Sequence, residues 1–148
     1  SMTGMYNRNA YDYFVKNEKD FEGYVIVTFD LNNLKQCNDQ YGHRAGDEYI
    51  INAAHIIEDN FERYGKCYRI GGDEFCCIIP KGRYFKIERV MHKIDQDVEI
   101  LNHKNIIPVP VGIAYGYAVF TADDTDPEKV RERADKDMYR NKKTMKQF

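Results

Sequence analysis

One short turn constrains this 148-residue chain more than any other feature. A Gly-Gly-Asp-Glu run at residues 71–74 stands between two short apolar segments, 66–70 and 75–79, that have the length and composition of strands. Paired glycines accept the positive φ angles that residues with a Cβ resist, so the run predicts a tight β-hairpin. Its tip would carry two carboxylates on a rigid sheet, and its glycines would let a bulky anion approach the backbone. An ordinary hairpin with two solvated acids also fits these residues.

The segments around this hairpin alternate between helical and strand patterns. The expected elements are helices from Asn7 (the N-cap) to about 21, 46–64, 83–101 and from Asp126 onward, with strands at 24–29 and 111–120. Hairpin-linked strands between helices predict an α+β fold, with a ferredoxin-like βαββαβ core and a mostly antiparallel central sheet flanked by helices. The glycines in 111–120 predict close packing against a neighbouring element, and the last helix is expected to bury Val130, Ala134, Met138 and Tyr139.

Composition excludes several classes of protein. A net charge of −2 and a pI near 6.1 argue against a nucleic-acid partner. No apolar run approaches the roughly 18 residues of a membrane span, and no secretory signal opens the chain, so we expect a cytoplasmic domain without membrane contact. A membrane anchor elsewhere in a longer protein is compatible with this expectation.

The four cysteines form no zinc-like CxxC pair and are expected to be buried, reduced thiols, as suits a cytoplasm. Cys76 and Cys77 should point to opposite faces of a strand, one into the core and one outward. The length fits a single domain spanning residues 1–148. Its abrupt start suggests that the domain comes from a longer protein.

Three carboxylates are expected to meet at one edge of the sheet. Asp30 ends the strand at 24–29, and Asp73 and Glu74 lie at the tip of the hairpin. Such a cluster needs a cation, and oxygen ligands favour Mg²⁺ or Mn²⁺, two of which can hold a triphosphate. Taken alone, Asp30 also fits a strand-end residue that caps the next turn.

The segment 38–47 is predicted to be a glycine-bounded loop that leads into the long helix. Asp47 could accept hydrogen bonds from N1 and the 2-amino group of guanine, and Asn38 could also bind the purine edge. Turn formation and helix initiation are the alternative roles. Lys142 and Lys146 lie one helical turn apart and could face the same phosphates, although a solvated basic helix end fits equally well.

Taken together, these segments resemble a GGDEF domain, the catalytic domain of diguanylate cyclases. The resemblance covers essentially the whole chain and is carried by Thr3–Arg8, Asp30–Lys35, Asn38-Asp39, Gly42–Asp47, Arg69–Phe75, and Ala134-Asp135 with Met138-Tyr139 and Lys142. It implies a nucleotidyl-cyclase-like fold.

The resemblance also implies a role for each matching residue. Asp30 and Asp73 resemble metal ligands, together with the main-chain carbonyl of Leu31. Two Mg²⁺ or Mn²⁺ ions would be held in each half-site. Asp73 further resembles the residue that assists deprotonation of a 3′-hydroxyl, and Glu74 would complete the acidic, catalytic cluster. The implied GTP-binding residues are Asn38 and Asp47 (guanine), His43 and Lys35 (same substrate segment), and Lys142 and Lys146 (phosphates).

The implied reaction joins two GTP molecules into cyclic di-GMP and releases two pyrophosphates. Because each domain would bind one GTP, a homodimer is required, and a fused N-terminal sensory or dimerisation domain is expected. A catalytically silent GGDEF module that binds GTP or a protein partner is the alternative. A cyclic di-GMP receptor and a cyclase of mixed GMP-AMP products fit less well.

Two positions depart from the family pattern. Asn32 stands where the second acid of the usual DxD segment is expected, which removes a charge near the metals. The RxxD tetrapeptide of the family's product-inhibition site corresponds to Glu62 and Gly65, so this site is absent. We therefore expect no feedback inhibition through it.

Overall fold

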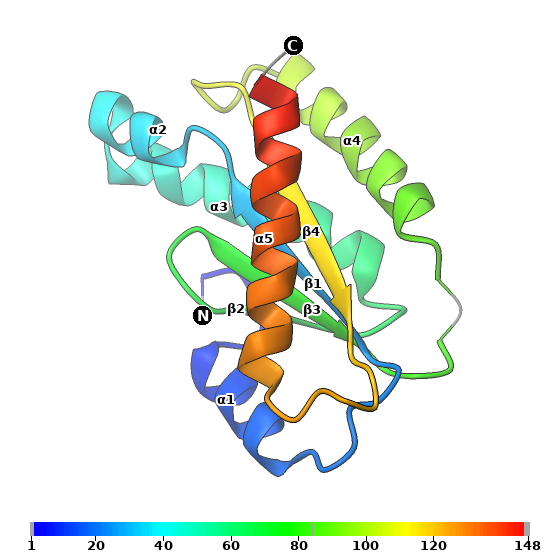
Figure 1. The fold of residues 1–148 in the computed structure, drawn as a ribbon. Helices are drawn as coiled ribbons and strands as arrows, with labels where there is room; N and C mark the ends of the chain where they lie inside the picture. Colours follow the sequence, from blue (N-terminus) through cyan, green and yellow to red (C-terminus); the bar gives the residue numbers. More distant parts are fainter. Residues whose placement is uncertain (1, 84, 147–148) are drawn as a thin grey trace.

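A computed structural model describes residues 2–83 and 85–146 of the chain, with side chains up to Lys142. Its elements, in chain order, are α1 (Arg8–Asn17), β1 (Val25–Leu31), α2 (Leu34–Tyr41), α3 (His43–Phe61), β2 (Lys66–Arg69), β3 (Glu74–Ile79), α4 (Ile87–His103), β4 (Ile113–Val119) and α5 (Pro127–Lys146) (Figure 1). Asn7 is the N-cap of α1 as predicted, and its side chain accepts a hydrogen bond from the Ala10 N–H at 2.9 Å.

The strands form one sheet in the order β2-β3-β1-β4, and every neighbouring pair is antiparallel. This order places β1 between β3 and β4, at the centre of the sheet. The α+β fold with a ferredoxin-like core is therefore confirmed. Among the described residues, no helix has both the length and the apolar character needed to cross a membrane.

Helices cover both faces of the sheet. Figure 1 shows α5 crossing one face, with α3 and α4 behind the sheet. Alternate residues of β1 accordingly enter two cores: Val27 packs in the core that contains Ile57 of α3, whereas Ile26 packs in the core with Val130 of α5. A site at the end of β1 is thus held from both sides.

The two covered faces explain the cysteines. Cys76 and Cys77 do point to opposite faces of β3, but both are fully buried, so the prediction that one points outward is wrong. That prediction assumed that one face of the sheet is exposed to solvent, whereas helices cover both faces. All four cysteines are free and buried, as expected.

The predicted loop at 38–47 is also wrong. Residues 34–41 form α2, and α3 starts at His43, with Gly42 at a φ of 90° between the two helices. Because α2 has only 8 residues and buries only Leu34 and Cys37, its periodicity is too short to stand out in the sequence.

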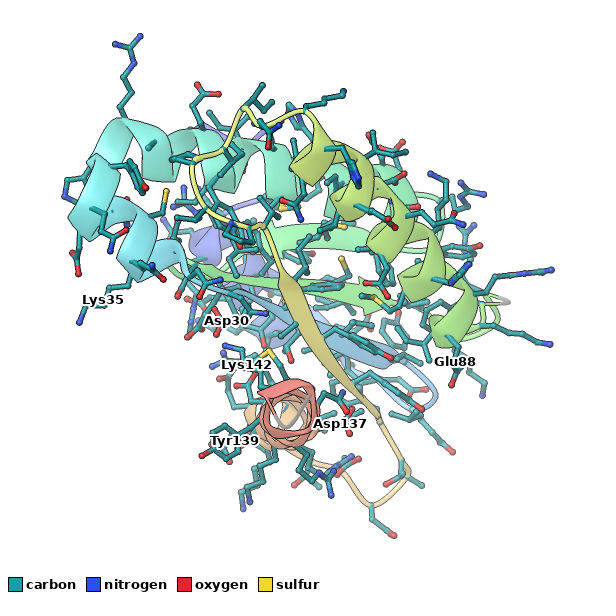
Figure 2. The ribbon with its side chains drawn as sticks, turned by 90° about the horizontal axis from the view of Figure 1, so that it is seen from above. Asp30, Lys35, Glu88, Asp137, Tyr139 and Lys142 are labelled. Carbon is teal, nitrogen blue, oxygen red and sulfur yellow. The ribbon has the colours of Figure 1, made fainter. Side chains whose placement is uncertain are left out.

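Two smaller expectations fail. Gly71 and Gly72 are not among the glycines with positive φ. The hairpin closes instead through a longer turn, in which the N–H groups of Ile70 and Gly71 donate to the Glu74 carbonyl oxygen at 3.0 and 3.3 Å. Tyr139 is 59% exposed on the outer side of α5 (Figure 2), so the prediction that it is buried is wrong. Val130 and Ala134 are buried as predicted.

Candidate active site

Strand register brings the predicted acidic residues to one edge of the sheet. Asp30 near the end of β1 pairs directly with Glu74, the first residue of β3, and Asp73 precedes Glu74 in the turn. Burial and the neighbouring charge of Asp30 raise the pKa of Asp73, and the two carboxyl groups are close enough to share a hydrogen bond. Asp30 and Asp73, from distant parts of the chain, therefore meet as expected.

Asp30 already has two polar partners. Its Oδ1 accepts a hydrogen bond from the Leu31 N–H at 2.9 Å, and its Oδ2 is paired with the Nζ of Lys142. About a fifth of the Asp30 side chain (21%) is exposed. In Figure 2, Lys142 reaches from α5 toward Asp30. Lys142 thus lies at the acidic edge, in contact with Asp30.

The expected cluster of three carboxylates is only partly formed. Glu74 contributes to the electrostatic field at Asp73, but its side chain is exposed and its carboxyl lies against Gly71. Among the described residues, no three His, Cys, Asp or Glu side chains group closely enough to hold a metal ion. The pair Asp30 and Asp73 still fits a hard divalent cation, because both are oxygen donors and their mutual repulsion would be relieved by positive charge.

The predicted guanine-binding residues are brought together where α2 meets α3. The Asn38 side chain lies against Gly46: a Cβ built on Gly46 would stand 1.7 Å from Asn38 Oδ1. Asp47 follows Gly46 and is exposed, and so is His43 at the start of α3. The Asn38 amide therefore lies against the N-terminal part of α3, which also carries the exposed Asp47.

The other two basic residues predicted to bind GTP are Lys35 and Lys146. Lys35 is exposed on α2 and extends away from Asp30 and Lys142 (Figure 2), so the structure does not bring it to the acidic edge. The backbone of residue 146 belongs to α5, but the side chain of Lys146 lies outside the described part of the chain.

Sequence reasoning missed a polar contact next to the site. The hydroxyl of Tyr49 donates to the Asn32 carbonyl oxygen and accepts from the Gly112 N–H. Nearby, the Asn102 side chain accepts from the Val111 N–H at 2.8 Å and donates to the Val111 carbonyl oxygen at 3.0 Å. Tyr49 lies on the apolar face of the helix predicted at 46–64, which by itself indicates only a core position. A tyrosine, rather than an aliphatic residue, on the buried face of α3 was the one available signal, since a buried hydroxyl needs a partner.

Comparison with known proteins identifies the family of this chain. The model of the family described as "Diguanylate cyclase, GGDEF domain" matches residues 1–147. Diguanylate cyclase DgcS of Shewanella oneidensis is 29% identical over 148 residues, which cover 96% of this chain and 48% of that protein. The probable diguanylate cyclase DgcT of Escherichia coli is 28% identical over 97% of this chain and 33% of its own length. This chain thus spans about half, or less, of the curated relatives it matches.

Solved structures show the same fold. The GGDEF domain of DgcB from Caulobacter crescentus, a crystal structure in complex with c-di-GMP, superposes with a TM-score of 0.81 at 24% identity, over 97% of this chain and 89% of that one. The family match covers nearly every residue, and the motifs and the antiparallel sheet agree with it. This chain therefore belongs to the GGDEF family of diguanylate cyclase domains.

Proposed function

We propose that this domain is an active diguanylate cyclase that condenses two GTP molecules into cyclic di-GMP and two pyrophosphates. The observation that carries this proposal is the proximity of the Asp30 and Asp73 carboxyl groups at the end of β1, beside Lys142 of α5. Asp30, Asp73 and the Leu31 carbonyl would hold Mg²⁺ or Mn²⁺, with Glu74 nearby. Bound cations, two in each half-site, would neutralise the triphosphate and make the 3′-hydroxyl more acidic.

The chain's own residues account for the other requirements. The Asp73 carboxylate at the tip of the hairpin would accept the proton of the 3′-hydroxyl. That oxygen forms a bond to the α-phosphorus of the other GTP, the bond between this phosphorus and the α,β-bridging oxygen breaks, and pyrophosphate leaves. Lys142 would compensate the negative charge of the phosphates. Asn38 and Asp47 would select guanine, because adenine would leave the Asp47 carboxylate without a donor.

Each domain supplies one half of the reaction, so two copies must face each other with nearly two-fold symmetry. The proposed regulation follows from this requirement. A fused sensory or dimerisation segment raises the effective concentration of the second domain.

The test is to fuse the chain to a dimerising coiled coil, add GTP and Mg²⁺, and follow cyclic dinucleotide and pyrophosphate. We expect two pyrophosphates for each cyclic di-GMP, and a loss of about 10²-fold or more in Asp73→Asn, which keeps the side-chain shape. No product from the dimerised wild type would support the silent-module alternative. Equal product from Asp73→Asn would contradict the proposed catalytic role of Asp73.

A further inference from the structure

We infer that Tyr49 is a positioning residue for the metal-binding turn after β1, an inference that rests on the proposed function. Tyr49 lies on α3 and is fully buried. Its hydroxyl oxygen lies 2.5 Å from the Asn32 carbonyl oxygen and 3.1 Å from that of Gly112, and it accepts a hydrogen bond from the Gly112 N–H at 3.0 Å. One hydroxyl thus joins the segment after β1 to the segment before β4.

The two segments are also joined directly. The Asn32 N–H donates to the Gly112 carbonyl oxygen at 2.8 Å, and a Cβ on Gly112 would stand 2.9 Å from Asn32 Nδ2. The next residue, Asn33, has a φ of 65°, a left-handed conformation that residues other than glycine adopt at some cost. The turn therefore depends on contacts from outside itself. Tyr49 supplies one directly, at the Asn32 carbonyl, and supports a second through Gly112.

These contacts orient a proposed metal ligand through the geometry of one peptide group. The Leu31 carbonyl and the Asn32 N–H belong to the same planar peptide, so the direction of one determines the direction of the other. The N–H is held by Gly112, and Gly112 is held by Tyr49. Loss of the Tyr49 hydroxyl would release this peptide and disorient the Leu31 carbonyl beside Asp30.

The place of Tyr49 on α3 adds a second consequence. Asp47, proposed to read guanine, lies two residues earlier on the same helix. Tyr49 therefore ties the helix that would bind the base to the turn that would bind the metal. Burial raises the pKa of Tyr49 to about 12, so its hydroxyl keeps its proton at neutral pH.

Tyr49→Phe tests this inference, with Tyr11→Phe as its matched control. Tyr11 is equally buried and donates a hydrogen bond to Glu128 at 3.0 Å, but it packs on the opposite face of the sheet. The readouts are Mn²⁺ affinity at saturating GTP by electron paramagnetic resonance, exchange of the Gly112 amide hydrogen, and turnover as a function of Mg²⁺ concentration.

We expect Tyr49→Phe to weaken Mn²⁺ binding about tenfold or more, as loss of a group that orients a metal ligand typically does. Gly112 exchange should become faster, and high Mg²⁺ should restore part of the turnover. Tyr11→Phe should lower the melting temperature without changing the Mn²⁺ affinity.

Unchanged Mn²⁺ affinity in Tyr49→Phe would show that Tyr49 acts only in packing. An equal loss of Mn²⁺ affinity in Tyr11→Phe would show the same. If the wild type binds Mn²⁺ and GTP but makes no cyclic dinucleotide, the proposed function fails while the Mn²⁺ comparison still decides the role of Tyr49. A wild type that binds no Mn²⁺ with GTP overturns both.

Discussion

At the scale of single residues, Gly46 is the position where the proposed guanine site depends most on the absence of a side chain. Asn38 Oδ1 occupies the space that a Cβ at Gly46 would need. A glycine inside a helix lowers stability by about 1 kcal/mol relative to alanine. Its presence in α3 therefore fits a requirement for room beside Asn38.

Gly46→Ala is predicted to displace the Asn38 amide and to raise the KM for GTP about tenfold, through loss of one polar contact. In an Asn38→Ala background, the same substitution should have no further effect on KM. A double-mutant cycle of KM values measures this coupling. Additive effects in the cycle would show that Gly46 acts independently of Asn38.

Buried tyrosines predict a loss of stability in alkali. The pKa of Tyr49 is raised by burial from 10.0 to about 12. Between these values the unfolded chain releases the phenol proton and the folded chain keeps it. The free energy of unfolding should therefore fall with rising pH, by about 1.4 kcal/mol per pH unit for one such group.

Denaturant unfolding of the wild type and Tyr49→Phe from pH 9 to pH 12 measures this slope. The variant should show a shallower decline above about pH 10, although Tyr68, whose pKa is also raised to about 12, still contributes. Parallel declines in the two proteins would contradict the assignment.

At the scale of elements, α5 is held in register with the outer edge of β4. Three side chains spaced four residues apart on α5 bond to backbone groups spaced two residues apart on β4. The pairs are Arg133 with the Val119 carbonyl, Asp137 with the Tyr117 N–H, and Asn141 with the Tyr115 carbonyl. Four helical residues rise about 6 Å and two strand residues about 6.8 Å, so the spacings nearly match. This register places Lys142 over Asp30 and covers backbone groups on an exposed edge.

Gly116→Ala should separate α5 from the sheet. A Cβ at this position would stand 2.2 Å from the Met138 nitrogen and 2.3 Å from the Ala134 carbonyl oxygen, which are backbone atoms of α5. We expect a loss of about 1–3 kcal/mol in the free energy of unfolding by chemical denaturation, the usual cost of overpacking. Lys142 should lose its contact with Asp30 at the same time.

Gly72→Ala is the matched control for this effect on stability. No atom lies within 4 Å of a Cβ built there, and the φ of Gly72 is not positive. Its free energy of unfolding should stay within about 0.5 kcal/mol of the wild type. Equal losses in both variants would show that the close approach of α5 is not the cause.

At the scale of the whole molecule, the face that carries the family's product-inhibition motif differs here in shape as well as in charge. A Cβ on Gly65 would stand 2.0 Å from the Ile78 carbonyl oxygen, so an aspartate cannot occupy this position without moving β3. Glu62, at the arginine position of the motif, is exposed and acidic. Neither end of an RxxD site is therefore available to a nucleotide.

We predict that cyclic di-GMP at micromolar concentration neither binds at this face nor slows the enzyme. Isothermal titration of the chain with cyclic di-GMP, together with rates at increasing product, measures both effects. The double substitution Glu62→Arg with Gly65→Asp should destabilise the fold rather than create a site, because of the contact with Ile78. Micromolar binding that Glu62→Ala abolishes would refute the prediction.

Local patterns in the sequence were enough to predict the sheet and its acidic edge. The apolar runs that became β1 and β3 are short and flanked by turn residues, and an antiparallel βαββ order leaves few ways to pair them. Asp30 and Asp73 could therefore be expected to meet. The helix α2 was missed because 8 residues with two buried positions give almost no periodic signal.

The motifs and strand patterns of this chain are sufficient to specify its family, its fold and the pair of carboxylates at the site. Those properties follow from backbone preferences and hydrophobic spacing over a few neighbouring residues. Three-dimensional packing alone selects the partners of these groups: Lys142 lies 112 residues from Asp30, and Tyr49 bonds across 17 and 63 residues. Contacts at such separations depend on how whole helices pack on the sheet. The spacing of residues within a single helix or strand does not determine that packing.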